Sequence, residues 1–145
     1  MTDIKYAFGA KKDPEDPRDF KISKFMAPVA RDALPVRCDV SKTMLAPRYQ
    51  GYEGTCVSFA ACAVKESQET KKYYLSPRFI NDRIALPEGG AYPRDAMDIL
   101  YKIGVCPETC QMYVPGVATK PCKAVLELAK PNKIKTYARL YTLDE

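Results

Sequence analysis

Residues 49–62 read YQGYEGTCVSFAAC, and this stretch decides the fold that the sequence predicts. Gly51 and Gly54 permit a tight loop, and Thr55 is a residue type that caps helices, so a helix is expected to begin beside it. The polar run over residues 65–72 predicts a solvated helix end. Apolar positions at helical spacing predict the buried face, which comprises Phe59, Ala60, Ala63 and Val64.

Cys56 stands at the N-terminus of this expected helix. The unpaired amides and the positive end of the helix dipole favour a thiolate there over a thiol. Cys56 is therefore a candidate nucleophile, and Gln50 is a candidate donor to a developing oxyanion, together with backbone amides nearby. The alternative is that Cys56 is a small buried hydrophobe, which is the common role of a free cysteine.

Three more helices and one strand are expected. Residues 76–84 should form a helix with Ser76 as its N-cap and a proline at its first position. Residues 93–104 predict a helix that ends at a glycine, and residues 122–129 predict a shorter one. Residues 132–143 alternate apolar and polar side chains, as a strand does.

The order Gln50-Gly51-Tyr52-Glu53-Gly54-Thr55-Cys56 resembles the active-site stretch of the papain-like cysteine peptidases. That stretch reads Gln-Gly-x-x-Gly-Ser/Thr-Cys and leads into an apolar helix. Further matches follow in the family's order, and together they cover roughly residues 34 to 115. They are Leu75-Ser76, the loop Gly89-Gly90-Ala91-Tyr92-Pro93 with one extra residue, and Gly104-Val105.

The resemblance implies an α+β fold, mainly the helical left lobe of a papain-like peptidase. It divides the chain into an extended N-terminal strap over 1–33, the helical lobe over 34–130, and an incomplete start of the β-barrel lobe over 131–145. The strap is similar to the one that precedes the domain in prokaryotic and viral-type members. It is shorter than the family's long inhibitory propeptide, because fewer than 50 residues precede the motif.

The same resemblance implies a role for each matching residue. Cys56 would be the nucleophile, and Gln50 would hold the oxyanion together with the backbone amide of Cys56. A peptide or protein would be the substrate. The residues expected to bind it are Gly54, Gly89, Gly90 and Tyr92.

Two positions depart from the family's pattern. Glu53 replaces the usual cysteine three residues before the nucleophile, so the family's disulfide is not expected. Val57 replaces the usual aromatic residue after the nucleophile. Neither change removes a reacting atom.

The chain contains no histidine. A cysteine peptidase needs a base that accepts the thiol proton and later protonates the leaving amine. In the family that histidine, and then an asparagine, lie about 130–150 residues after the nucleophile, and residue 145 is the last one here. We therefore expect the chain to be inactive alone and to need a complementary lobe or protein partner. The alternative is a non-catalytic papain-like structural or binding module in a larger assembly such as a virion.

Other chemistry is weakly indicated. Cys106, Cys110 and Cys122 leave a zinc site, a disulfide and free thiols open, with free thiols as the default, and no metal or cofactor is expected. The net charge of +5 comes from scattered basic residues, so nucleic acid is not an expected partner. No apolar stretch predicts a membrane span, and the polar, proline-containing N-terminus predicts no secretion signal. A cytoplasmic or virion-associated location is expected.

Overall fold

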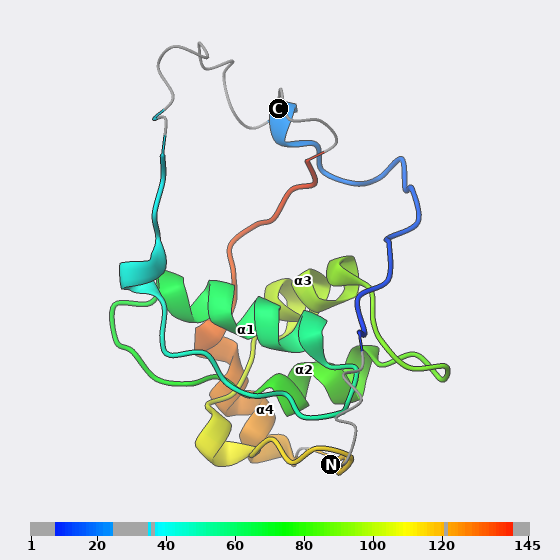
Figure 1. Ribbon diagram of the computed structural model, residues 1–145, viewed down its shortest axis with the longest axis vertical. Coiled ribbons are helices and arrows are strands. Elements are labelled where there is room, and N and C mark those ends of the chain that lie inside the picture. Colours follow the sequence, from blue (N-terminus) through cyan, green and yellow to red (C-terminus); the bar gives the residue numbers. More distant parts are fainter. Residues whose placement is uncertain (1–7, 25–34, 36, 121, 141–145) are drawn as a thin grey trace, which may run out of the picture.

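The computed structural model describes residues 8–24, 35, 37–120 and 122–140. In this part of the chain four α-helices form one body, and the extended segments that precede α1 and follow α4 lead away from it toward the same end of the molecule (Figure 1). The α-helices are α1 (Cys56–Gln68), α2 (Pro77–Ile84), α3 (Pro93–Lys102) and α4 (Lys123–Ala129). Single 3₁₀ turns are η1 (Ile22–Lys24), η3 (Ser41–Thr43), η4 (Glu108–Cys110) and η5 (Lys130–Asn132). The four predicted helices are confirmed.

Local signals explain where α2 begins and where α3 ends. The Ser76 side chain accepts the Phe79 amide at 3.0 Å, and Pro77 occupies the first position of α2. After α3 the backbone turns at Gly104, whose φ is +91°. A Cβ at Gly104 would lie 2.1 Å from the Ala129 carbonyl oxygen, so only glycine fits this turn.

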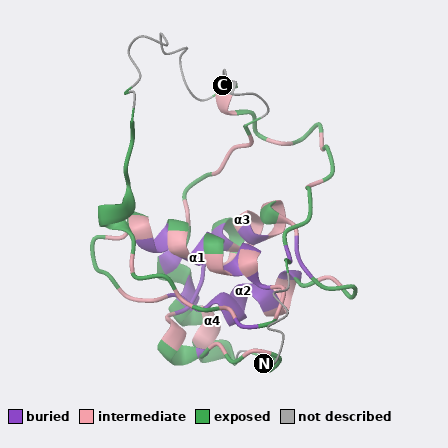
Figure 2. Ribbon diagram, in the orientation of Figure 1, coloured by how far each residue is buried: buried purple, intermediate pink, exposed green. Residues whose placement is uncertain are grey.

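The hydrophobic core lies where α1, α2 and α3 contact one another (Figure 2). The side chains of Phe79 and Ile80 on α2 are fully buried, and Ala96 and Leu100 on α3 pack in the same cluster. This burial supplies most of the free energy that holds three short helices together.

The buried face of α1 differs from the predicted one. Ala60 is exposed and Val64 is 49% exposed, whereas the helix buries Val57, Ser58, Ala61, Cys62, Lys65 and Glu66. Small and apolar residues occur on both sides of α1, so periodicity predicts the helix and leaves its rotation undetermined. Contacts with α2 and α3 decide which side is covered.

Glu66 is a second correction, because it was expected in the solvated tail and is 3% exposed. Its carboxylate accepts the Leu75 amide at 2.7 Å and pairs with the Arg48 guanidinium at 2.8 Å. Arg48 also pairs with Glu108 at 2.6 Å. Burial raises the pKa of Glu66. Through these bonds Glu66 joins α1 to Leu75, which precedes α2, and through Arg48 to Glu108 of η4. A buried carboxylate is tolerated at this position because its oxygens have hydrogen-bond and ion-pair partners.

The predicted strand over 132–143 is not present among the described residues, and residues 141–143 lie outside them. Arg139 forms one parallel bridge, to Lys21, in which its amide donates to the Phe20 carbonyl at 2.8 Å. A strand needs a neighbour along its length, and here the strap meets it at one residue. The expected β part of an α+β fold is therefore not seen in the described chain.

The strap is extended over residues 8–16 and turns at residues 17–19, where the Asp19 amide donates to the Asp16 carbonyl at 3.0 Å. The rest of 1–33 lies largely outside the described residues. The strap runs along one side of the helical body, from the loop before α3 to the segment around Arg139 (Figure 1). No helix of the described chain combines the length and the apolarity that a membrane span requires.

Candidate active site

Cys56 is the first residue of α1 and is half-buried. Its Sγ accepts the Gly9 amide of the strap at 3.3 Å. Beside it lies a cavity of about 300 Å³ with mainly apolar walls, formed in part by Ala60, Ala96 and Met97. The sulfur thus borders a hollow on the helix surface and does not belong to the fully buried core.

The remaining cysteines have different surroundings. Cys62 and Cys106 are fully buried, and burial raises the pKa of Cys106 to about 12 and that of Cys62 well above its ordinary value. Thiols held in this way are unreactive. All six cysteines are free, and the described residues contain no metal-binding cluster of three or more cysteine or carboxylate side chains.

Thr55 does not cap α1 through its side chain, contrary to prediction. Its Oγ1 instead lies 2.9 Å from the hydroxyl of Tyr113, which donates to the Gln50 carbonyl at 2.7 Å. The Thr55 hydroxyl thus makes a partly buried contact between two loops. The helix begins where the sequence predicts, but the expected capping hydrogen bond is not formed. The first turn of α1 consequently lacks a cap from this residue.

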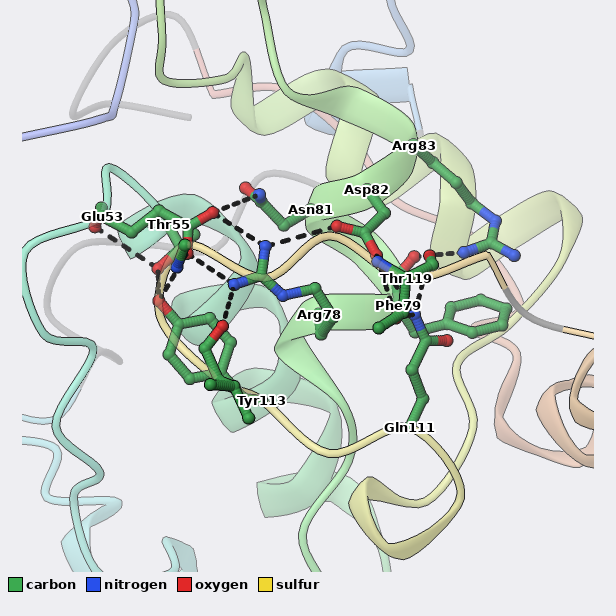
Figure 3. A network of polar contacts seen from close by, with 12 residues as sticks. Glu53, Thr55, Arg78, Phe79, Asn81, Asp82, Arg83, Gln111, Tyr113 and Thr119 are labelled. Atoms are coloured by element: carbon green, nitrogen blue, oxygen red, sulfur yellow. Dashed lines mark hydrogen bonds and ion pairs between the residues drawn. The ribbon is translucent and has the colours of Figure 1, made fainter.

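A network of polar contacts fixes the loop that leads to Cys56 (Figure 3). Arg78, the second residue of α2, is 1% exposed, and its guanidinium binds both carboxylate oxygens of Glu53. It also donates to the Val114 carbonyl at 2.7 Å, and Glu53 accepts the Gly116 amide at 2.8 Å. The Arg78 guanidinium lowers the pKa of Glu53. The sequence analysis did not predict this network. Its one signal was an arginine in the first turn of α2, next to the apolar pair Phe79 and Ile80.

Glu53 occupies the position where the resembled family has a cysteine. An ion pair with hydrogen bonds on both partners therefore joins this loop to α2 and to residues 111–119. Such a bidentate pair fixes the orientation as well as the distance of the groups it joins. The loop in front of the candidate nucleophile is held without a covalent link.

Gln50 lies in the same loop, and its side-chain amide donates to the Glu53 carbonyl at 3.0 Å. This bond orients the side chain along the loop that ends at Cys56. Its role as an oxyanion donor stays a prediction.

The expected substrate-binding residues divide into two groups. Gly54 and Gly90 lie together, since a Cβ at Gly54 would be 3.5 Å from the Gly90 nitrogen. Gly89 has a φ of +87° and open space where a Cβ would stand. Tyr92 is the N-cap residue of α3, and its carbonyl accepts the Asp95 amide at 3.1 Å. The structure thus brings Gly54 and Gly90 to the Cys56 region and gives Tyr92 a role in the loop.

No protein-family model matches the sequence, and no curated protein matches it. Among solved structures, the chain is similar to xylellain, a cysteine protease from Xylella fastidiosa, with a TM-score of 0.74 and 25% sequence identity. The match covers 99% of this chain and 63% of that one. This chain therefore has a papain-like, peptidase-like fold and spans 63% of the length of that protease.

Two allergen structures match over smaller parts. One comes from work on the mite allergens Blo t 1 and Der p 1, with a TM-score of 0.49 and 25% identity, covering 63% of this chain and 34% of that one. The other is the Amb a 11 cysteine protease of ragweed pollen in its proform, with a TM-score of 0.48 and 22% identity, covering 59% and 28% of the two chains.

Proposed function

We propose that the chain is the helical, thiol-bearing lobe of a papain-like cysteine peptidase of prokaryotic or viral type, and that Cys56 is its nucleophile. One observation carries the proposal: in a fold similar to that of a cysteine protease, Cys56 is the first residue of α1, half-buried, and borders a cavity. The other two cysteines near the core are fully buried and stay protonated, so neither competes for this role.

The reaction that follows is peptide-bond hydrolysis. The Cys56 thiolate attacks the scissile carbonyl carbon, and the positive end of α1 stabilises negative charge at its N-terminus. The backbone amide of Cys56 and the Gln50 side chain are proposed donors to the tetrahedral oxyanion. A base outside these 145 residues takes the thiol proton and passes it to the leaving amine. Water then hydrolyses the acyl-enzyme.

The base is proposed to come from a lobe that covers one face of α1. Ala60 and Val64 leave an apolar strip exposed on this helix, and the half-buried Met97 of α3 lies beside it. An apolar strip that runs along a helix and ends at Cys56 suits a partner that must present an imidazole to this sulfur. The 145-residue chain alone is accordingly expected to show no turnover.

An extended peptide is the proposed substrate. Gly54 and Gly90 present backbone without side chains near Cys56, and Gly89 and Tyr92 belong to the loop that carries Gly90. A backbone edge of this kind admits a peptide through main-chain hydrogen bonds.

The test compares two reagents with the same electrophile, one attached to a short extended peptide and one without it. The rate of Cys56 modification is followed by peptide mapping at near-neutral pH in the native chain and in the variant Gly9→Ala. An added Cβ at Gly9 would lie 1.9 Å from the Gly54 carbonyl oxygen, so this variant displaces the Gly9 amide from the Cys56 sulfur. We expect Cys56 to favour the peptide-bearing reagent by about tenfold in that variant. The exposed Cys38, Cys110 and Cys122 should show no such preference.

Modification of Cys56 by either reagent no faster than that of Cys38, in both forms of the chain, would count against an activated nucleophile. It would favour the non-catalytic papain-like module. A further control is Gln50→Ala, which should lower the preference for the peptide-bearing reagent if this amide acts on the carbonyl oxygen.

A further inference from the structure

Another cavity, of about 350 Å³, is lined by residues of the strap, of α3 and of the segment after η5. Its walls contain three aromatic rings and one carboxylate, which belong to Phe20, Tyr101, Tyr137 and Asp98. Among the described residues, none lines both this cavity and the one beside Cys56. The volume is at the small end of ligand pockets, which range from about 300 to 1,000 Å³.

The aromatic rings of this cavity lie at its surface. Tyr101 is 47% exposed and Phe20 is 54% exposed, although large apolar side chains are usually covered where a core is close by. The ring centroids of Tyr101 and Tyr137 are 6.2 Å apart, and the ring planes are inclined by 71°. The two tyrosines therefore form a corner of the cavity. Aromatic ring faces attract a cation that lies within about 6 Å of the ring centroid.

Asp98 adds a negative charge to the aromatic walls. One of its carboxylate oxygens accepts the Tyr137 hydroxyl, and the other accepts Lys102 Nζ at 2.5 Å. Burial and the Asp98 carboxylate raise the pKa of Tyr137, so this hydroxyl keeps the proton that it donates. Asp98, Tyr101 and Lys102 are spaced i, i+3 and i+4 along α3, which places them on one face of the helix. The helix thus sets a carboxylate beside two aromatic rings.

A cation of the chain already lies at this carboxylate. The Lys102 side chain is 64% exposed, and it pairs with Asp98 across one turn of α3. Exposed pairs of this kind contribute little to stability, so an incoming cation that also contacts the rings can replace Lys102 at low cost. In the adjoining cavity Arg94 and Arg139 both pair with Asp19, which compensates their positive charge.

We propose that this cavity binds the quaternary ammonium group of a small molecule of the choline or betaine class. The methyl groups of such a cation pack against the rings, while its charge is attracted by the ring faces and by Asp98. A primary ammonium is less suited, because it is strongly hydrated and has three donors that aromatic walls do not satisfy. The site does not depend on what Cys56 does, so it stands or falls separately from the proposed peptidase function.

The test titrates the full chain with choline and, separately, with its neutral isostere, in which carbon replaces the ammonium nitrogen. Binding is followed through the ring signals of Tyr101 and Tyr137 by NMR. The two probes have the same shape, so a difference between them measures the contribution of the charge. We expect choline to bind about tenfold more tightly than the isostere.

Four variants locate the binding. Tyr101→Ala and Asp98→Asn should each weaken choline binding by about fivefold, and Tyr49→Ala, at an exposed tyrosine outside the cavity, should leave it unchanged. Lys102→Ala removes the competing cation and should tighten binding by about twofold. A structural role for these residues would not produce an increase in affinity.

Equal binding of choline and the isostere would overturn the proposal, because the site would then recognise shape without charge. Unchanged choline affinity in Tyr101→Ala would also overturn it, and this variant alters an exposed side chain that the core does not need. A third arm uses phosphatidylcholine vesicles. Binding to the vesicles without binding to free choline would assign the site to a membrane surface and overturn the assignment to a small molecule.

Discussion

The starts of α1 and α2 look alike in sequence and differ in structure. Each follows a hydroxyl residue, Thr55 or Ser76, and in the folded chain each has a cysteine beside it, Cys56 at α1 and Cys106 at α2. Ser76 caps α2 and its amide donates to the carbonyl of Cys106, which is fully buried. Thr55 leaves α1 without a side-chain cap, and Cys56 is half-buried next to the strap.

This difference separates a helix start whose polar groups are bonded within the fold from one that borders a cavity. At α2 the capping bond and the burial of Cys106 satisfy the local groups within the fold. At α1 the Thr55 hydroxyl bonds to Tyr113 and leaves the first turn without a side-chain cap. The positive end of the α1 dipole lies at Cys56, which contacts the strap and borders the cavity. Arg78 joins the two starts, because it belongs to α2 and binds the loop before α1.

The largest effect is expected from Arg78→Ala, which breaks the link between the two helix starts. Removing this side chain leaves the Glu53 carboxylate without its ion-pair partner and opens space in the core, so the free energy of unfolding should fall by about 3 kcal/mol. Urea unfolding measures the change. Arg37→Ala, at a pair whose arginine is 85% exposed, should cost below about 0.5 kcal/mol, and equal losses in the two variants would contradict a special role for Arg78.

The second prediction concerns the pH dependence of stability from the cysteine beside α2. The pKa of Cys106 is about 12 in the folded chain and 9.0 for an ordinary thiol, so unfolding releases a proton between these values. Its contribution to stability is fully present below pH 9 and is lost as the pH rises toward 12, by up to about 1.4 kcal/mol per pH unit. Cys106→Ala should flatten this decline, as measured by urea unfolding at several pH values. The exposed Cys110 provides the control, and an equal flattening in Cys110→Ala would refute the assignment.

The third prediction tests the cap of α2 directly. Ser76→Ala removes the acceptor of the Phe79 amide and the donor to the Gln111 carbonyl, so stability should fall by about 1–2 kcal/mol. Thermal or urea unfolding measures it. Ser76→Thr keeps the hydroxyl and should recover part of the loss; an unaffected Ser76→Ala variant would show that α2 does not depend on its cap.

The smallest effect is expected from the hydrogen bond between the hydroxyls of Thr55 and Tyr113. A double-mutant cycle of Thr55→Val and Tyr113→Phe should give a coupling free energy of about 0.5–1 kcal/mol, because each change removes one partner of the same hydrogen bond. The cycle of Ser76→Ala with Tyr113→Phe serves as the matched control and should give none. Zero coupling in the first cycle would show that the hydrogen bond between Thr55 and Tyr113 does not stabilise the fold.

Much of the fold followed from local signals. Ser76, Pro77 and Gly104 marked helix ends that the structure confirms, since caps and backbone restrictions act within a few residues. The covered side of α1 and the predicted strand near Arg139 were wrong. Both features depend on which distant segments of the chain pack against them, and a single sequence does not predict such long-range contacts.

The sequence by itself determined four helices, the glycine-rich loop and a cysteine at the first position of α1, because dihedral restrictions, capping and periodicity are properties of neighbouring residues. Tertiary structure alone decided that Glu53 pairs with Arg78 and that Gly9 lies against Cys56. These contacts join residues 25 and 47 positions apart in the chain. Their energies depend on three-dimensional closeness and burial, which arise only when the whole body has packed.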